Sequence, residues 1–365
     1  MKAELFAVST PGLEPVTADE LRALGLPAEI SQGGVTTRGT LHDVTRLNAG
    51  LRTASRLLQR VGRFRATTFP ALRRETAALP WERFLARDGA VALRVTCRKS
   101  RLHHSGAVAE RVLGGIADRI GVSPHTAKPV EDPAEDGPQL VVVRFEDDEA
   151  TLSVDTSGAL LHRRGYRQET AKAPLRETLA AAMVLLSGWD RVSPLVDPFC
   201  GSGTLLCEAD AIARGRLPGA DRMFAWQRWP CARGIRVVVP PEGAAGAPLF
   251  GNDHDAGAIR AATGNAARAG AAVNFTQADA TALLPPAAGP GWIITNPPWG
   301  VRVDTNRPLT ALYARVGAHW RARWPGWRVC LLAPGALAQA TGIAWERVTP
   351  VVNGGVRVEV RVGRA

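Results

Sequence analysis

The alternation of apolar and polar residues at the start of the chain predicts a small α+β module. Residues 3–10 (AELFAVST) and 34–39 (GVTTRG) have the period-two pattern of strands, and residues 17–26 (TADELRALGL) have the spacing of an amphipathic helix. A second such module follows, with a strand, a basic loop and a helix over residues 90–121 and a hairpin over residues 139–158. The pattern therefore predicts domains at residues 1–65 and 66–156.

The segment between these modules is strongly basic. Residues 44–74 contain eight arginines and no acid, and Arg52, Arg56 and Arg60 lie four residues apart beside regularly spaced apolar residues. At helical spacing this places a basic stripe opposite an apolar one. The stripe is either a solvated outer face or a surface that contacts phosphates.

A third part begins near residue 157, where the composition changes. Residues 160–189 read as a basic linker that runs into an amphipathic helix, and nine of the ten tryptophans lie beyond residue 157. Further along, apolar strands alternate with helices, which is typical of a doubly wound α/β sheet. We therefore expect a third domain at residues 157–365.

The overall charge indicates a polyanionic partner. The formal net charge is +11 and 41 of the 45 cationic residues are arginine, which suits phosphate contacts and base stacking but equally follows from a GC-rich genome. The loop at residues 98–104 is a candidate nucleic-acid contact through Arg98, Lys99, Arg101 and His103, although a solvated loop has the same composition. His103 and His104 lack a third ligand at suitable spacing, so we expect no metal site.

The remaining composition suggests an intracellular setting. The five cysteines are scattered and form no C-x-x-C pair, which predicts reduced thiols rather than disulfides or a zinc ribbon. The apolar runs are shorter than the ~20 residues that cross a bilayer, and the first 15 residues lack the apolar segment of a signal peptide. We expect a cytoplasmic monomer without a membrane partner.

The first candidate for chemistry is a glycine-rich turn after a strand. Residues 194–215 read as a strand ending in Asp197, a turn containing Gly201 and Gly203, and a helix. The glycines allow a ligand close to the backbone, but the last glycine of G-x-G-x-x-G and the lysine of a P-loop are missing. A carboxylate before the turn repels a pyrophosphate and suits a ligand that carries a positive amino group.

Two more acids follow later strands in the same way. Asp253 ends one predicted strand and suits the two hydroxyls of a ribose, and Asp279 ends the next and suits an adenine amino group. Taken singly, each is more often a helix cap or a loop residue. Because successive parallel strands end at one edge of a sheet, we expect the three acids to share that edge.

The fourth strand end is the sequence WIITNPPWG at residues 292–300. The prolines stiffen the turn, so the Asn296 amide oxygen and the Pro297 carbonyl form a fixed pair of acceptors for an exocyclic amine. Trp299 offers a face on which a base can stack. The turn is therefore a candidate catalytic site for modification of a base amine.

These segments together resemble a known family. DPFCGSGT (197–204), GNDHD (251–255), QADA (277–280) and NPPWG (296–300) are similar to the motifs of class I S-adenosylmethionine (SAM) dependent amino-methyltransferases. Residues 10–25, 98–112 and especially 161–183 resemble the ferredoxin-like, THUMP and linker segments of bacterial THUMP-domain 23S rRNA guanine-N2-methyltransferases. Residues 224–230 (FAWQRWP) also resemble that family, although hydrophobic packing explains them equally well.

The resemblance implies a fold, a cofactor and site residues. The fold is α/β, a Rossmann-like methyltransferase domain at residues 157–365 after ferredoxin-like (1–65) and THUMP (66–156) domains, and the cofactor is SAM. SAM would be bound by Asp197, Cys200, Gly201, Ser202, Gly203, Asp253, His254, Asp279, Ala280 and Asn296. Asn296, Pro297 and Trp299 would be catalytic. RNA would be bound by Arg98, Lys99, Arg101, His103, Arg163, Arg164 and Arg167.

The chain departs from the family pattern in two respects. Trp299 stands where tyrosine or phenylalanine is usual, which keeps a stacking face and removes a hydroxyl. The second, guanine-N7 methylating half found in some relatives is expected to be absent.

Several alternatives stay open at this stage. The tRNA guanine-N2 enzymes share the THUMP module, the glycine loop and the N-P-P turn, while the linker and residues 224–230 favour 23S rRNA. A protein-glutamine methyltransferase, a pyrimidine C5 enzyme with Cys200 or Cys231 as nucleophile, and a non-catalytic RNA-binding assembly factor are further alternatives.

Overall fold

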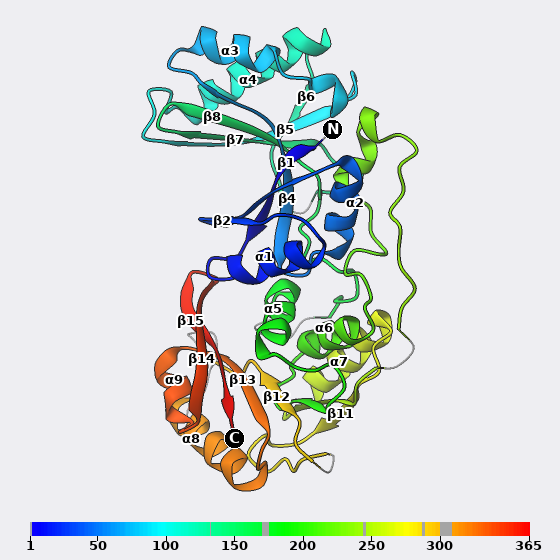
Figure 1. Ribbon diagram of the computed structural model, residues 1–365, viewed down its shortest axis with the longest axis vertical. Coiled ribbons are helices and arrows are strands. Elements are labelled where there is room, and N and C mark those ends of the chain that lie inside the picture. Colours follow the sequence, from blue (N-terminus) through cyan, green and yellow to red (C-terminus); the bar gives the residue numbers. More distant parts are fainter. Residues whose placement is uncertain (1, 132, 170–174, 244–245, 287–288, 300–308) are drawn as a thin grey trace. The chain divides into compact units, whose positions relative to one another are not determined.

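The computed structural model describes residues 2–131, 133–169, 175–243, 246–286, 289–299 and 309–365. The chain divides into two compact units, each assembled from separate stretches of sequence (Figure 1). Unit 1 contains residues 1–8, 18–161 and 221–238, and unit 2 contains residues 9–17, 162–220 and 239–365. This division into two units does not test the predicted domain boundaries at residues 65 and 157, which stay predictions.

Unit 1 is built on one sheet of eight strands. Their order is β2-β3-β1-β4-β8-β7-β5-β6, so strands of both predicted amino-terminal domains join through the antiparallel β4–β8 pair. The predicted hairpin at residues 139–158 is confirmed as β7 and β8. The strands are β1 Ala3–Ser9, β2 Glu29–Ser31, β3 Gly34–Gly39, β4 Ala54–Arg65, β5 Ala90–Arg98, β6 His125–Ala127, β7 Gln139–Glu146 and β8 Glu149–Asp155.

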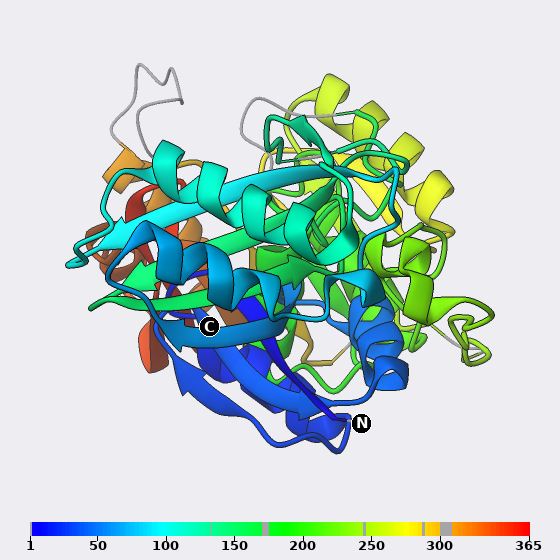
Figure 2. The same cartoon turned by 90° about the horizontal axis from the view of Figure 1, so that it is seen from above.

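The helices α2 (Leu41–Gly50), α3 (Phe69–Ala77) and α4 (Ser105–Ile120) belong to this part, and α1 (Glu14–Ala23) starts in unit 2 and continues into unit 1. Helix α1 begins three residues before the predicted helix at residues 17–26. Helices α3 and α4 lie side by side over one face of the sheet (Figure 2). Gly115 permits their close approach, because a Cβ there would lie 2.7 Å from the Arg73 carbonyl oxygen.

The predicted basic helical stripe is wrong. Arg56 and Arg60 lie on the twelve-residue strand β4, where side chains four apart share one face of the sheet. Arg56 is buried and pairs with Asp155. Arg60 donates to Ser153 and lies 3.6 Å from a Glu4 carboxylate oxygen. The acids that neutralise these arginines lie on strands distant in sequence. The absence of acids from residues 44–74 therefore overstated how much unpaired positive charge this segment carries in the folded protein.

Residues 224–230 are used for packing within unit 1. They form parts of two short 3-10 helices, Ala225–Arg228 and Pro230–Ala232. The buried Trp229 donates its indole N–H to the Gln139 side chain at 2.8 Å and packs edge-on against Phe84, with ring centroids 4.9 Å apart. Trp226 is also buried, and its backbone N–H donates to the Thr156 carbonyl. The packing interpretation of this segment therefore accounts for both tryptophans.

Unit 2 contains the predicted doubly wound sheet. Seven strands lie in the order β11-β10-β9-β12-β13-β15-β14, parallel from β11 to β13, with β15 antiparallel to both neighbours. From β9 the strand order runs through β10 to β11 on one side and through β12 to β13 on the other, so it reverses between β9 and β12. The strands are β9 Leu195–Asp197, β10 Leu249–Asp253, β11 Asn274–Gln277, β12 Trp292–Thr295, β13 Arg328–Ala333, β14 Ala344–Asn353 and β15 Val356–Arg364.

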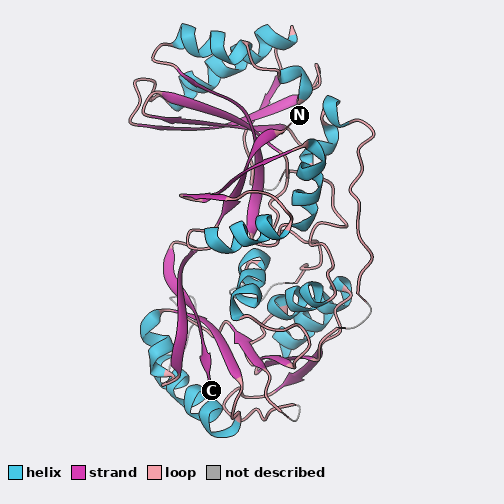
Figure 3. Cartoon of the chain, in the orientation of Figure 1, coloured by secondary structure: helices cyan, strands magenta, loops and turns pink. Residues whose placement is uncertain are grey.

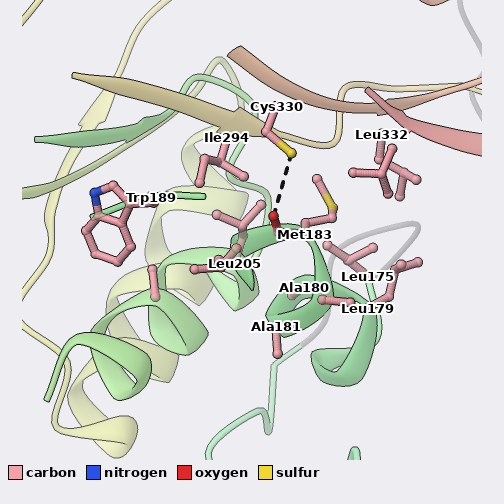
Figure 4. Close-up of a cluster of buried hydrophobic side chains, with 14 of the residues drawn as sticks. Leu175, Leu179, Ala180, Ala181, Met183, Trp189, Leu205, Ile294, Cys330 and Leu332 are labelled. Atoms are coloured by element: carbon pink, nitrogen blue, oxygen red, sulfur yellow. Dashed lines mark hydrogen bonds between the residues drawn. The ribbon is translucent and has the colours of Figure 1, made fainter. Parts of the chain in front are cut away.

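Helices cover both faces of this sheet (Figure 3). Helices α5 (Glu177–Ser187), α6 (Thr204–Ala213) and α7 (Ala256–Ala269) lie on one face, and α8 (Leu309–Arg323) and α9 (Gly335–Ala340) lie on the other. Met183 and Leu205 pack toward Ile294, Cys330 and Leu332 of the strands (Figure 4). Among the described residues, no helix is long and apolar enough to span a membrane.

The core of unit 2 also includes residues from the start of the chain. Leu13 and Val16 belong to the same buried cluster as Val351 and Val358 of the β14–β15 hairpin. The Val352 N–H donates to the Pro11 carbonyl at 3.1 Å, and a Cβ at Gly12 would lie 2.0 Å from the Pro350 carbonyl oxygen. Residues 9–17 are therefore an integral part of this unit.

Candidate active site

The pairing of parallel strands brings the expected residues to one edge of the sheet. Asp197 lies opposite Gly251 in the β9–β10 pair, and Asp253 lies opposite Gln277 in the β10–β11 pair. Asn296 directly follows β12, which pairs with β9 on its other side. The carboxyl ends of these strands therefore carry Asp197, Asp253, Asp279 and Asn296 along the same edge, beside the reversal of strand order where open α/β sheets bind ligands.

The glycine-rich turn between β9 and α6 is closely fitted to the sheet. Gly203 has a φ of +79°, and a Cβ there would lie 3.1 Å from the Ala262 Cβ of α7. The Cys200 N–H donates to the Asn252 carbonyl at 2.9 Å, and the Gly201 N–H donates to Asp253 Oδ2 at 3.0 Å. The turn is thus held against the end of β10 through its backbone.

Asp197 is a buried carboxylate, and one of its two oxygens already accepts hydrogen bonds from the protein. Its Oδ1 accepts from the Thr295 hydroxyl at 2.6 Å and from the Phe199 N–H at 3.1 Å. Its Oδ2 has no hydrogen-bond partner among the residues that the structure describes. Burial, together with the nearby Asp253 carboxylate, raises the pKa of Asp197 to about 7, although the two hydrogen bonds oppose this shift. A cationic ligand would stabilise the ionised form.

Asp253 and Asp279 have different surroundings on this edge. Asp253 accepts from the Gly201 N–H through one oxygen and from the Asp255 N–H through the other, at 3.0 Å each, and the exposed His254 lies 3.2 Å from it. A carboxylate has four acceptor positions, so two remain for hydroxyl groups. Asp279 is exposed, and the N–H and hydroxyl of Thr281 lower its pKa. Ala280 beside it is buried.

Two asparagines that the sequence analysis missed organise this edge. The buried Asn252 donates to the Pro198 carbonyl at 3.3 Å and to the Ala278 carbonyl at 3.0 Å, which joins the loops after β9 and β11. The buried Asn265 donates to the carbonyls of Ser202 and Glu169 at 3.0 Å each, which joins the glycine-rich turn to the linker. Asn252 lies within the quoted GNDHD motif, whereas Asn265 lies mid-helix and no local signal indicates its partners.

The N-P-P turn contains an internal hydrogen bond. The Trp299 Nε1–H donates to Asn296 Oδ1 at 2.7 Å, and Trp299 packs, partly buried, against the core of unit 2. Pro297 is buried, and the Tyr313 hydroxyl donates to the Pro298 carbonyl at 3.3 Å. The turn is therefore held from both sides, and one lone pair of the Asn296 amide oxygen remains for a substrate amine. Gly300 of the motif lies outside the described residues.

The cysteines do not provide a nucleophile at this edge. Cys200 is buried in the glycine-rich turn, and burial together with Asp197 and Asp253 raises its thiol pKa far above the usual value. Such a thiol is almost entirely protonated near neutral pH. Cys231 belongs to the segment that packs in unit 1. The arrangement argues against the cysteine-dependent C5 mechanism.

The predicted RNA contacts fall into two groups. Arg98, Lys99, Arg101 and His103 are exposed on the loop between β5 and α4, where the Arg101 N–H donates to Asp148 Oδ1 at 2.7 Å. His104 accepts the Ala107 N–H and caps α4, which gives it a structural role. Arg163 is exposed on the linker.

The side chains of Arg164 and Arg167 are largely inaccessible, contrary to what RNA contact requires. The Arg164 side chain is 4% exposed and lies 3.4 Å from Glu208. Arg167 lies 3.0 Å from a Glu177 oxygen and donates to the Leu175 carbonyl at 2.8 Å. These pairs hold the linker against α5 and α6, so we assign both arginines a structural role in place of RNA contact. Residues 170–174 of the linker motif lie outside the described residues.

The fold and the strand-edge site define a class I methyltransferase. A family model described as "RMKL-like, methyltransferase domain" matches residues 164–348, and one described as "RlmL ferredoxin-like domain" matches residues 4–58. The chain belongs to this RMKL-like methyltransferase family.

Its similarity to named relatives extends over nearly the whole chain. The Ribosomal RNA large subunit methyltransferase K/L of Syntrophotalea carbinolica is 35% identical over 96% of this chain and 52% of its own length. The chain thus spans about half the length of that relative. A possible methylase from Clostridium difficile 630 has a TM-score of 0.87 at 26% identity, covering 100% of this chain and 98% of its own. The methyltransferase SMU.472, in complex with SAH, has a TM-score of 0.85 at 27% identity, covering 100% and 98%.

Proposed function

We propose that this chain transfers a methyl group from SAM to the exocyclic N2 of a guanosine in 23S rRNA. The observation that carries the proposal is the single sheet edge on which Asp197, Asp253 and the N-P-P turn lie. Similarity to a large-subunit rRNA methyltransferase over nearly the whole chain supports the substrate class. The net charge of +11 supports an RNA partner.

The residues at this edge fit SAM. Oδ2 of Asp197, which accepts no hydrogen bond from a described residue, suits an ammonium group, and such a group would offset the burial that raises the pKa of this carboxyl. The free acceptor positions of Asp253 suit the ribose hydroxyls, and Asp279 with the buried Ala280 suits the adenine. The cofactor supplies an electrophilic methyl group on a sulfonium.

The N-P-P turn performs the positioning that methyl transfer needs. Asn296 Oδ1 and the Pro297 carbonyl accept the two hydrogens of the guanine amine and thereby direct its nitrogen lone pair along the line of transfer. These hydrogen bonds favour the pyramidal amine, so they are stronger in the transition state than in the ground state. The nitrogen becomes acidic once it is methylated, so water can accept the proton and no strong base is required. Extruding the base from its stack costs about a few kcal/mol, which stacking on Trp299 offsets.

The exposed loop at residues 98–104 is the proposed RNA contact of unit 1. Arg98, Lys99 and Arg101 are each exposed there, and the exposed Arg65 at the end of β4 adds positive charge. Asp148 lies 3.8 Å from Arg65 and 3.9 Å from Arg101, so one carboxylate orients two cations without neutralising the loop. Phosphate contacts from such a loop give affinity rather than sequence specificity.

Nucleoside mass spectrometry tests the proposal. rRNA and tRNA from a strain that lacks the gene are digested and compared with those of the parent and of strains complemented with wild type or Asn296→Ala. Loss of N2-methylguanosine from 23S rRNA, restored by wild type alone, is the expected result. Loss from tRNA instead would show that the tRNA alternative is right, and loss from neither would contradict the proposal. Calorimetry with SAM separates an active enzyme from a non-catalytic RNA-binding factor.

A further inference from the structure

Unit 1 contains a pocket that has no role in the proposed methyl transfer. Its volume is about 280 Å³, close to the lower end of the ~300–1,000 Å³ typical of small-molecule sites. Distant parts of the sequence form it: the start of α2, strand β4, the 3-10 helix Trp81–Arg83 and the segment at residues 221–238. The lining residues are Ala3, Thr40, Leu41, His42, Gln59, Arg83 and Cys231.

Gln59 is the residue that most clearly indicates a ligand. It lies on β4 with only 7% of its surface exposed, and its backbone pairs with Val154 in the sheet. In the described part of the chain, its side-chain amide has no hydrogen-bond partner. A ligand in the pocket would supply both a donor and an acceptor.

The other end of the pocket is positive. Arg83 is exposed, makes no ion pair with a described carboxylate, and lies 5.8 Å from the Phe84 ring centroid. His42 is exposed in the first turn of α2, which Thr40 caps, so the helix dipole adds positive potential there. Two carboxylates beside these lining residues already have partners: Asp43 is bound by Thr40 and Arg46, and Glu82 by Arg119. The pocket thus combines a side-chain amide with an end that carries the Arg83 guanidinium.

We propose that this pocket binds one nucleotide of single-stranded RNA, its base on Gln59 and its phosphate toward Arg83. A glutamine amide matches the adjacent donor and acceptor on an adenine edge, so adenosine is the preferred nucleotide. The volume accommodates a single nucleotide and not a helix. The proposal extends the proposed RNA substrate by assigning a second contact with an unpaired base, at a site separate from the one that holds SAM.

Cys231 lines the pocket, so its rate of alkylation measures whether a ligand occupies the pocket. The full chain is treated with iodoacetamide, and the alkylation rates of Cys231 and Cys97 are followed by peptide mass spectrometry. Cys97 is a partly exposed thiol of the same unit that does not line the pocket, and it serves as the internal reference. S-adenosylhomocysteine is present throughout, so that AMP cannot act through the cofactor site. We expect AMP to slow alkylation of Cys231 at least about five-fold relative to Cys97, and ribose 5-phosphate to have little effect.

Two variants separate the pocket from folding effects. Gln59→Leu removes the amide, and we expect it to weaken AMP protection about three- to ten-fold, as for loss of one to two hydrogen bonds. Gln32→Leu changes an exposed glutamine of the same unit outside the pocket and should leave protection intact. Equal alkylation of Cys231 with and without AMP, or full protection in Gln59→Leu at unchanged Tm, would overturn the proposal. The assay needs no methyl transfer, so its outcome is independent of the proposed reaction.

Discussion

The indole N–H of Trp299 donates to the amide oxygen of Asn296 at 2.7 Å. Phenylalanine has no donor with which to make this bond, and the hydroxyl of tyrosine lies farther from the backbone. The tryptophan of this chain therefore adds a positioning role to the stacking face expected from the sequence. In the proposed reaction, this bond would fix which atom of the Asn296 amide faces the substrate amine.

Trp299→Phe tests this positioning role. The variant keeps an aromatic face and loses about 1 kcal/mol of hydrogen bonding, so we expect kcat to fall roughly five-fold. KM for SAM should stay unchanged, because Trp299 is not among the residues proposed to hold it. Steady-state kinetics on the RNA substrate give both values. A fall in kcat no larger in Trp299→Phe than in a conservative change elsewhere, such as Gln339→Glu on α9, would show that the bond does not contribute.

We expect Asp197→Asn to favour the folded, ligand-free protein at high pH and to weaken the binding of SAM. Burial raises the pKa of Asp197 from a usual value near 4 to about 7, so the folded state favours the protonated form. The resulting stabilisation is complete below about pH 4 and is lost as the pH rises through about 7. Asparagine cannot ionise, so without ligand we expect the Tm of the variant, relative to wild type, to be higher at pH 8 than at pH 5.

The affinity for SAM should depend on pH in the opposite sense to the stability of the ligand-free protein. An ammonium group prefers the ionised carboxylate, so the affinity of wild type for SAM should rise as the pH increases from 6 to 7.5. The variant should bind weakly at both values. Calorimetry with SAM measures this, and equal affinity in wild type and Asp197→Asn would remove Asp197 from the site.

Gly203→Ala is expected to destabilise the glycine-rich turn. The φ of +79° disfavours alanine by about 1–2 kcal/mol, and its Cβ would lie 3.1 Å from that of Ala262. Gly215→Ala is the matched control, because Gly215 has a φ of +68° and nothing within 4 Å of an added Cβ. We expect a larger loss of Tm and of SAM affinity in Gly203→Ala. Equal losses in the two variants would indicate that backbone conformation alone matters.

Arg167 and Arg98 should separate structural arginines from RNA contacts. Arg167→Ala leaves the buried Glu177 without its partner, and we expect it to cost about 3–5 kcal/mol of unfolding free energy. Replacing both residues, as Arg167→Met with Glu177→Leu, should recover much of that loss. Arg98→Ala should leave Tm nearly unchanged and reduce the salt dependence of RNA binding by about one ion. Denaturant unfolding and filter binding over a salt series distinguish the two; a stable Arg167→Ala with weakened RNA binding would reverse our assignment.

The sequence predicted the parts of this site that depend on local pattern. Two of the residues, Asp197 and Asp253, end apolar strands, and Asn296 directly follows another. The parallel pairing of these strands was enough to place all three on one edge of the sheet. The burial of Arg56 and Arg164 was beyond such reasoning, because their partners Asp155 and Glu208 lie far away in the sequence. Similarly, Trp226 and Trp229 follow a helix of unit 2 in sequence but pack in unit 1, which no local periodicity indicates.

The contribution of Leu13 and Val16 to the core of unit 2 has a consequence for how the protein folds. These residues are synthesised long before their neighbours Val351 and Val358, which lie far along the same chain. Contacts between such distant residues close a very long loop and form late. Unit 2 therefore completes its core only after Val351 and Val358 have left the ribosome, and until then Leu13 and Val16 are apolar side chains without these partners.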